Sequence, residues 1–95
     1  TTLKFTRAAE NDLGRIWDYT TENWGEAQAI RYIREIQFAC EGLIKGHSVS
    51  RSADSIRPGY RKTACGSHMI YFRKIDNQIN VVRILHQSMD GDHHI

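Results

Sequence analysis

The hydrophobic pattern of this chain changes its period once, near residue 47, and that change limits the possible folds more than any other feature. Before it, apolar residues recur at steps of three and four, the period of a helix that packs on one side. After it, short apolar runs alternate with polar residues between turn signals, which indicates β-strands. A strand-like stretch at residues 1–6 precedes the helical half. This order predicts an α+β fold with helices on one side of a largely antiparallel sheet.

The helical half has one interruption, at Gly25, which divides it into two helices. Thr6 is a suitable N-cap for the first helix, and Gly46 suits the C-terminus of the second. Neither helix is expected to be stable alone in water, because helices of this length depend on tertiary packing. We therefore expect them to pack as an antiparallel hairpin.

The second half is expected to form strands at residues 60–64, 68–75 and 79–86, after a polar segment at 47–59. The last two strands flank a compact turn at 76–78, which we expect Ile75 and Ile79 to close as a three-residue loop.

That loop would set the register of the last two strands. The predicted opposite pairs are Ile70 with Ile84, Phe72 with Val82, Tyr71 with Arg83, and His68 with His86. The first two pairs would face the helices and form the core, and Tyr71 with Arg83 would lie on the other face of the sheet.

The size and composition indicate one domain spanning residues 1–95. No apolar run approaches the roughly 20 residues that span a bilayer, and no signal-peptide pattern opens the chain, so we expect a cytoplasmic protein. Cys40 and Cys65 lie far apart in sequence and do not resemble a disulfide framework.

The charge is unevenly distributed between the halves. Residues 1–46 carry six Lys/Arg and seven Asp/Glu, whereas residues 51–83 carry seven Lys/Arg and only two Asp/Glu. The second half therefore presents a basic surface that suits an acidic partner, although a solvated sheet face accounts for the same pattern.

Three motifs in the second half resemble one known family. They are Ile56-Arg57-x-Gly59, Gly66-Ser67-His68, and Arg83-Ile84-Leu85-His86-x-x-Met89-Asp90. In this order and spacing they resemble the ParE toxins of bacterial type II toxin–antitoxin modules, within the RelE/ParE superfamily. The resemblance extends over nearly the whole chain, from about Phe5 to Asp90, because residues 9–33 also resemble the ParE helical hairpin.

The resemblance implies a small toxin that a cognate ParD-like antitoxin neutralises. Several ParE toxins poison DNA gyrase by trapping it on cleaved DNA and have no catalytic chemistry of their own. We therefore expect a gyrase inhibitor that is not an enzyme, with no cofactor, no membrane association and no sequence-specific nucleic-acid binding by the toxin alone. Two alternatives stay open: a RelE-like ribosome-dependent mRNA endonuclease, and a ParE-like protein with another target.

The target-binding residues are expected on the basic face of the second half. They are Arg61, Lys62, Arg73 and Arg83, together with His86. Metal-independent RNA cleavage would need a base, an acid and cations around the phosphate. If the chain is a nuclease, the catalytic candidates are His86, Arg83, Arg73 and Arg61.

The antitoxin is expected to bind the helical hairpin. Trp17, Tyr19, Trp24 and Tyr32 recur there, and two helices over one sheet cannot bury all four. Exposed apolar patches on small proteins usually mark partner sites. The predicted antitoxin-binding residues are Leu13, Trp17, Trp24 and Tyr32.

The C-terminal segment is rich in metal-ligand types: His86, Asp90, Asp92, His93 and His94. The last residues of a domain usually fray, however, and metal sites need fixed geometry. We therefore predict no metal site and interpret His68 and His86 as a structural pair.

Overall fold

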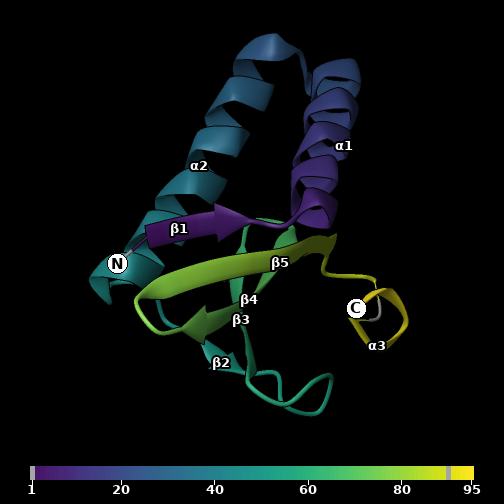
Figure 1. Cartoon of the computed structure of the whole chain (residues 1–95). Coiled ribbons are helices and arrows are strands. Elements are labelled where there is room, and N and C mark those ends of the chain that lie inside the picture. Colours follow the sequence, from purple (N-terminus) through teal and green to yellow (C-terminus); the bar gives the residue numbers. More distant parts are fainter. Residues whose placement is uncertain (1, 90) are drawn as a thin grey trace.

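The computed structural model describes residues 2–89 and 91–95. In chain order the elements are β1 (Thr2–Phe5), α1 (Arg7–Trp24), α2 (Glu26–Lys45), β2 (Arg51–Ser52), β3 (Tyr60–Cys65), β4 (His68–Ile75), β5 (Gln78–His86) and α3 (Gly91–His94). Figure 1 shows α1 and α2 side by side as a hairpin that rises from one side of the sheet, so their connection lies far from the strands. The predicted α+β fold is confirmed.

Both helices begin and end where the sequence predicts. The Thr6 side-chain oxygen accepts a hydrogen bond from the Ala9 N–H at 3.1 Å, and its hydroxyl donates to the Val82 carbonyl at 2.8 Å. The cap therefore also ties α1 to β5. Gly25 separates the helices with φ of 91°, and Gly46 ends α2 in the left-handed region with φ of 77°, a conformation that glycine adopts most easily.

The sheet has the order β1-β5-β4-β3-β2. β1 runs parallel to β5, and the other neighbours are antiparallel, as in a largely antiparallel sheet. Sequence reasoning missed β2, because this two-residue strand lies in the polar segment that was expected to be a loop.

The register of β4 and β5 confirms part of the prediction and corrects the rest. Ile70 pairs with Ile84, Tyr71 with Arg83, and His68 with His86, as predicted. Nearer the turn the prediction is wrong: Ile75 pairs with Gln78 and Phe72 with Val81, not with Val82. The turn has two residues rather than three, with φ of 53° at Asp76, and a bulge at Val82 restores the expected register beyond it.

This bulge places Val82 away from the helices. Val81 occupies the position in the helix-side core that was predicted for Val82, beside Phe72, Ile84 and the α2 residue Ile36. Val82 joins a second apolar cluster with Ala53, Tyr71 and Leu85, against which Ile56, Tyr60, Met69 and Ile95 pack. Both faces of the sheet therefore carry buried side chains.

The chain end packs on this second cluster rather than fraying, which corrects the expectation for the tail. Gly91 is buried, and a Cβ there would lie 2.7 Å from Ile56 Cδ1 and 2.9 Å from the Tyr71 hydroxyl. The Arg83 guanidinium also donates to the His94 carbonyl at 2.6 Å. Close packing at Gly91 and this hydrogen bond hold the α3 turn.

Both cysteines are free thiols, and Cys40 is buried. Burial raises the pKa of the Cys40 thiol to about 12, so it behaves as a small apolar core residue. Within the described ranges, neither long helix is apolar enough to cross a membrane.

Candidate functional site: the hairpin groove

A hollow of about 910 Å³ lies between the helical hairpin and the adjacent end of the sheet. We call it the hairpin groove. Its lining residues come from α1, α2, the β3–β4 turn, the start of β4, β5 and the turn after β5: Asp12, Arg15, Ile16, Tyr19, Thr20, Trp24, Gln28, Tyr32, Ser67, His68, Arg83, Ile84, Leu85, His86, Ser88 and Met89.

Asp12 forms the floor of this groove and joins α1 to β5. Its carboxylate accepts hydrogen bonds from Arg83 Nε at 2.8 Å, Arg83 Nη2 at 3.0 Å and the Ile84 N–H at 2.9 Å. A fourth donor is Arg15 Nη2, at 2.8 Å. β1 pairs with β5 only up to Val81, so the Ile84 N–H lies on an open strand edge. Asp12 accepts the hydrogen bond of this N–H, which would otherwise have no partner in the sheet.

The charged state of Asp12 follows from these contacts. The Asp12 side chain is 4% exposed and that of Arg83 is 19% exposed. Burial by itself would raise the pKa of Asp12, but the hydrogen bonds from Arg83, the Ile84 N–H and Arg15 outweigh it and lower the pKa below its usual value of 3.8. The same contact raises the pKa of Arg83.

Tyr32 and the two histidines form the wall of the groove nearest the sheet end. The Tyr32 hydroxyl lies 2.6 Å from His68 Nδ1 and accepts the Ser67 N–H at 3.0 Å. The His68 and His86 rings meet edge to face, with their centroids 5.4 Å apart. Burial, with the neighbouring His86, lowers the pKa of His68, and burial raises the pKa of Tyr32, so both stay neutral near pH 7.

The outer rim of the groove exposes two aromatic side chains from α1. Tyr19 is 65% exposed and Trp24 is 71% exposed, while Arg15 beside them is 67% exposed. The expectation that the hairpin cannot bury all its aromatics is therefore confirmed. The rim offers apolar surface next to an exposed cation.

The predicted antitoxin-binding residues fall into two groups. Trp24 and Tyr32 line the groove. Leu13 packs against the helix-side core, and Trp17 is half-buried outside the groove lining. Helical spacing identified the hairpin, but it does not separate core positions from rim positions.

The predicted target-binding residues are also divided. Arg83 and His86 line the groove, whereas Arg61, Lys62 and Arg73 lie on β3 and β4 outside it. Arg61 pairs with Phe72 on the helix side, so Lys62 beside it points to the opposite face. The four predicted cations therefore do not share one face, because neighbouring residues of a strand alternate.

The groove residues absent from the predicted site include Asp12, Arg15 and Tyr19. Asp12 had a recognisable signal, since it continues the buried stripe of Ala9, Ile16 and Thr20 along α1. A carboxylate on an apolar stripe indicates a buried partner, but only the tertiary structure identifies that partner as Arg83.

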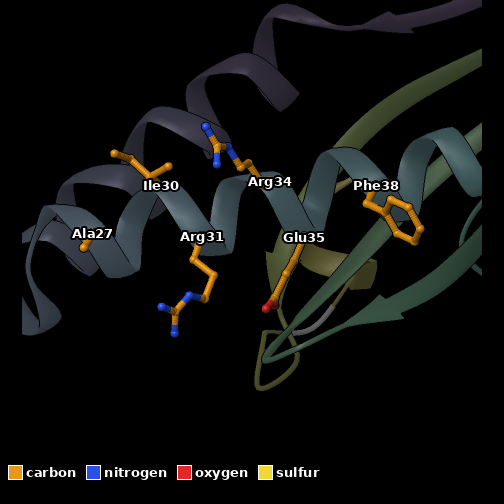
Figure 2. Close-up of a pocket in the computed structure, with 6 residues that line it drawn as sticks. All are labelled: Ala27, Ile30, Arg31, Arg34, Glu35 and Phe38. Carbon is orange, nitrogen blue, oxygen red and sulfur yellow. The ribbon is translucent and has the colours of Figure 1, made fainter.

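A second, shallower hollow lies on the outer face of α2. It is lined by Ala27, Ile30, Arg31, Arg34, Glu35 and Phe38. Figure 2 shows Arg31 and Glu35 pointing to one side of the helix and Ile30 and Arg34 to the other. Phe38 is 78% exposed. This face lies apart from the hairpin groove and provides a natural control surface for experiments.

The metal-ligand types of the tail do not come together in the part of the chain that the structure describes. No three His, Cys, Asp or Glu side chains there are placed to hold an ion. His86 instead bonds to Ser88, with Nδ1 2.8 Å from the hydroxyl oxygen. Asp90, also named among the candidate ligands, lies outside the described residues.

The sequence and the fold both resemble characterised toxins. A family model described as "ParE toxin of type II toxin-antitoxin system, parDE" matches residues 3–91. A protein named Toxin ParE1 from Mycobacterium tuberculosis strain H37Rv is 44% identical over 89 residues, which cover 93% of this chain and 91% of the relative. Another Toxin ParE1, from Caulobacter vibrioides, is 35% identical over 92 residues, covering 97% and 95%.

Two solved structures share the fold. One, described as a chromosomal ParDE system from P. aeruginosa, superposes with a TM-score of 0.77 at 24% identity and covers 90% of this chain and 95% of the other. The other, a YoeB–YefM toxin–antitoxin complex from Staphylococcus aureus, gives a TM-score of 0.59 at 13% identity, covering 90% and 94%.

The fold and these matches define the class of this protein as a toxin of a type II toxin–antitoxin system. Within that class, the match over residues 3–91 is specific: the chain belongs to the ParE toxin family.

Proposed function

We propose that this ParE-family toxin inhibits DNA gyrase in the cytoplasm and is neutralised by a ParD-like antitoxin that binds in the hairpin groove. The observation that carries the antitoxin assignment is the exposed aromatic rim at Tyr19 and Trp24 above a groove of about 910 Å³. An amphipathic helix that lays its apolar face into a groove is a common mode of peptide recognition. Arg15 at the rim would select acidic residues on the polar face of that helix.

Truncating Trp24 tests this site. We expect Trp24→Ala to weaken binding of the cognate antitoxin by about 30-fold or more, because exposed aromatic anchors that become buried in an interface are typical hot spots. Isothermal titration calorimetry measures the change. The matched control is Phe38→Ala on the outer face of α2, which removes an equally exposed aromatic and should change the affinity little. If Phe38→Ala weakens binding and Trp24→Ala does not, the antitoxin binds the outer face of α2 and the groove assignment is wrong.

The dispersal of the candidate catalytic groups supports a non-enzymatic mode of inhibition. Arg83 is held by Asp12 and the His94 carbonyl, and Arg61 donates to Ser50 at 2.9 Å. Arg61 and Arg73 lie outside the groove that contains His86. Metal-independent RNA cleavage would need these groups to converge on one phosphate.

Substitution of His86 separates the two mechanisms. In a gyrase inhibitor, His86→Gln should leave trapped gyrase–DNA cleavage complexes within about twofold of wild type, because an exposed surface contact contributes little binding energy. In a ribosome-dependent nuclease, loss of a general acid or base should lower the rate of transcript cleavage by about 10²–10⁴-fold.

Purified gyrase with supercoiled plasmid, run beside an in vitro translation reaction, measures both activities. His47 is an exposed histidine on the loop after α2, and His47→Gln is the control for the removal of an imidazole. The proposed target would be refuted if the wild-type protein has no effect on gyrase and cuts transcripts, and if these cuts disappear in His86→Gln.

A further inference from the structure

The edge of the sheet formed by β2, β3 and β4 carries three cations on the face away from the helices. Arg51 lies directly opposite Lys62 across the β2–β3 pair, and Lys62 in turn pairs with Tyr71 of the second apolar cluster. Arg73 lies two residues beyond Tyr71 on β4, so it shares this face. We call Arg51, Lys62 and Arg73 the basic corner.

This arrangement is unfavourable for the fold itself. Residues directly opposite on antiparallel strands have Cβ atoms about 4.5–5.5 Å apart, and like charges in such pairs destabilise the sheet. The ion pairs recorded for the described residues join Asp12 to Arg15 and to Arg83 and involve none of the three cations. Asp54, on the adjacent loop, instead accepts the Gly59 N–H at 2.7 Å. The charge of the corner is therefore not compensated by a carboxylate within the described chain.

One of the three cations is already held in position. The Arg73 guanidinium lies over the Tyr60 ring, 5.7 Å from its centroid, which limits its freedom without using its hydrogen-bond donors. A planar guanidinium held in this way is suited to bidentate binding of phosphate.

We propose that the basic corner binds the sugar-phosphate backbone of double-stranded DNA without reading its sequence. The choice of DNA rests on the proposed function, because a gyrase inhibitor acts beside the DNA that gyrase holds. Phosphates supply the dense negative charge that three uncompensated cations require. An acidic protein surface fits less well, because protein interfaces need an apolar centre. Four of the seven exposed large apolar side chains of the described residues lie on the hairpin, and only Val49 and Ile75 lie within two residues of a corner cation in sequence.

Fluorescence anisotropy of the full chain with a short labelled duplex of random sequence tests this site. If three phosphates are contacted, raising the salt from about 50 to about 200 mM should weaken binding about 40-fold. The variant Arg51→Gln/Lys62→Gln/Arg73→Gln should bind weakly and show little salt dependence. The control variant Arg7→Gln/Arg31→Gln/Arg34→Gln removes the same charge from the helices and should bind DNA as wild type does. Arg31 and Arg34 lie on the outer face of α2 (Figure 2).

Two results would overturn the proposal. Equal loss of affinity in both triple variants would mean that net charge, not the basic corner, binds DNA. Stronger competition by poly-glutamate than by unlabelled duplex would mean that the ligand is an acidic polypeptide. A thermal melt checks the physical premise: Arg51→Gln, which leaves the Arg73–Tyr60 contact in place, should have a Tm equal to or above that of wild type. A lower Tm would contradict the unfavourable Arg51–Lys62 pairing.

A gyrase assay on the same variants separates this inference from the proposed function. DNA binding at the corner by a wild-type protein that does not inhibit gyrase would refute the target while supporting the DNA site. Full inhibition of gyrase by the basic-corner variant, with no DNA binding by wild type, would refute the DNA site alone.

Discussion

Replacing Asp12 with alanine is expected to lower the free energy of unfolding by about 3–5 kcal/mol, because it leaves a partly buried arginine without its counter-ion. The same change leaves the Ile84 N–H, which now donates to Asp12 at 2.9 Å, without a partner at the strand edge. Since small domains have only about 5–15 kcal/mol of stability, the loss should be visible as a large shift of the urea midpoint.

Two further variants isolate the cause. Asp18→Ala removes an exposed carboxylate from the same helix and should change stability by less than about 0.5 kcal/mol. Asp12→Asn keeps an oxygen that can accept the Ile84 N–H but loses the charge, so it should be intermediate. If Asp12→Ala costs no more than Asp18→Ala, the Asp12–Arg83 contact contributes nothing to folding.

The contribution of Asp12 should also depend on pH. Its pKa is lower in the folded state than its usual value of 3.8, so its stabilising effect is fully present above that value and is lost as the pH falls through the folded-state pKa. The stability difference between wild type and Asp12→Ala should therefore be constant near neutral pH and shrink below about pH 4.

Truncation of Ile84 is expected to cost about 2–5 kcal/mol, the range for removing a buried branched side chain from a packed core. Ile84 is buried in the helix-side core, opposite Ile70. Val49→Ala, at a largely exposed position, is the control and should cost less than about 0.5 kcal/mol. Denaturant unfolding measures both. A cost below about 1 kcal/mol for Ile84→Ala would mean that the two faces of β5 are reversed.

Hydrophobic periodicity was sufficient to predict the α+β class, both helices and the three longer strands, and the residue types at Thr6, Gly25 and Gly46 predicted the ends of the helices. These features depend on contacts between residues close in sequence, which a pattern records directly. The pairings of Ile70 with Ile84 and of His68 with His86 were predictable for the same reason, because a short turn joins the two strands.

The register near the turn was not predictable, because two and three turn residues fit the same sequence and the Val82 bulge compensates the difference. The packed tail was missed because its partners, Ile56 and Tyr71, come from other parts of the chain. The same holds for the basic corner, where Arg51 and Lys62 meet only through the unpredicted β2.

By itself, the sequence determined which segments are helix or strand and which family the chain resembles. Only the tertiary structure decided that Asp12 binds Arg83 and Ile84, and that Trp24, Tyr32, Arg83 and His86 line one groove while Arg61, Lys62 and Arg73 lie outside it. The physical reason is that such sites are assembled from residues about 20 to 70 positions apart, whose meeting depends on how whole elements pack rather than on any local pattern.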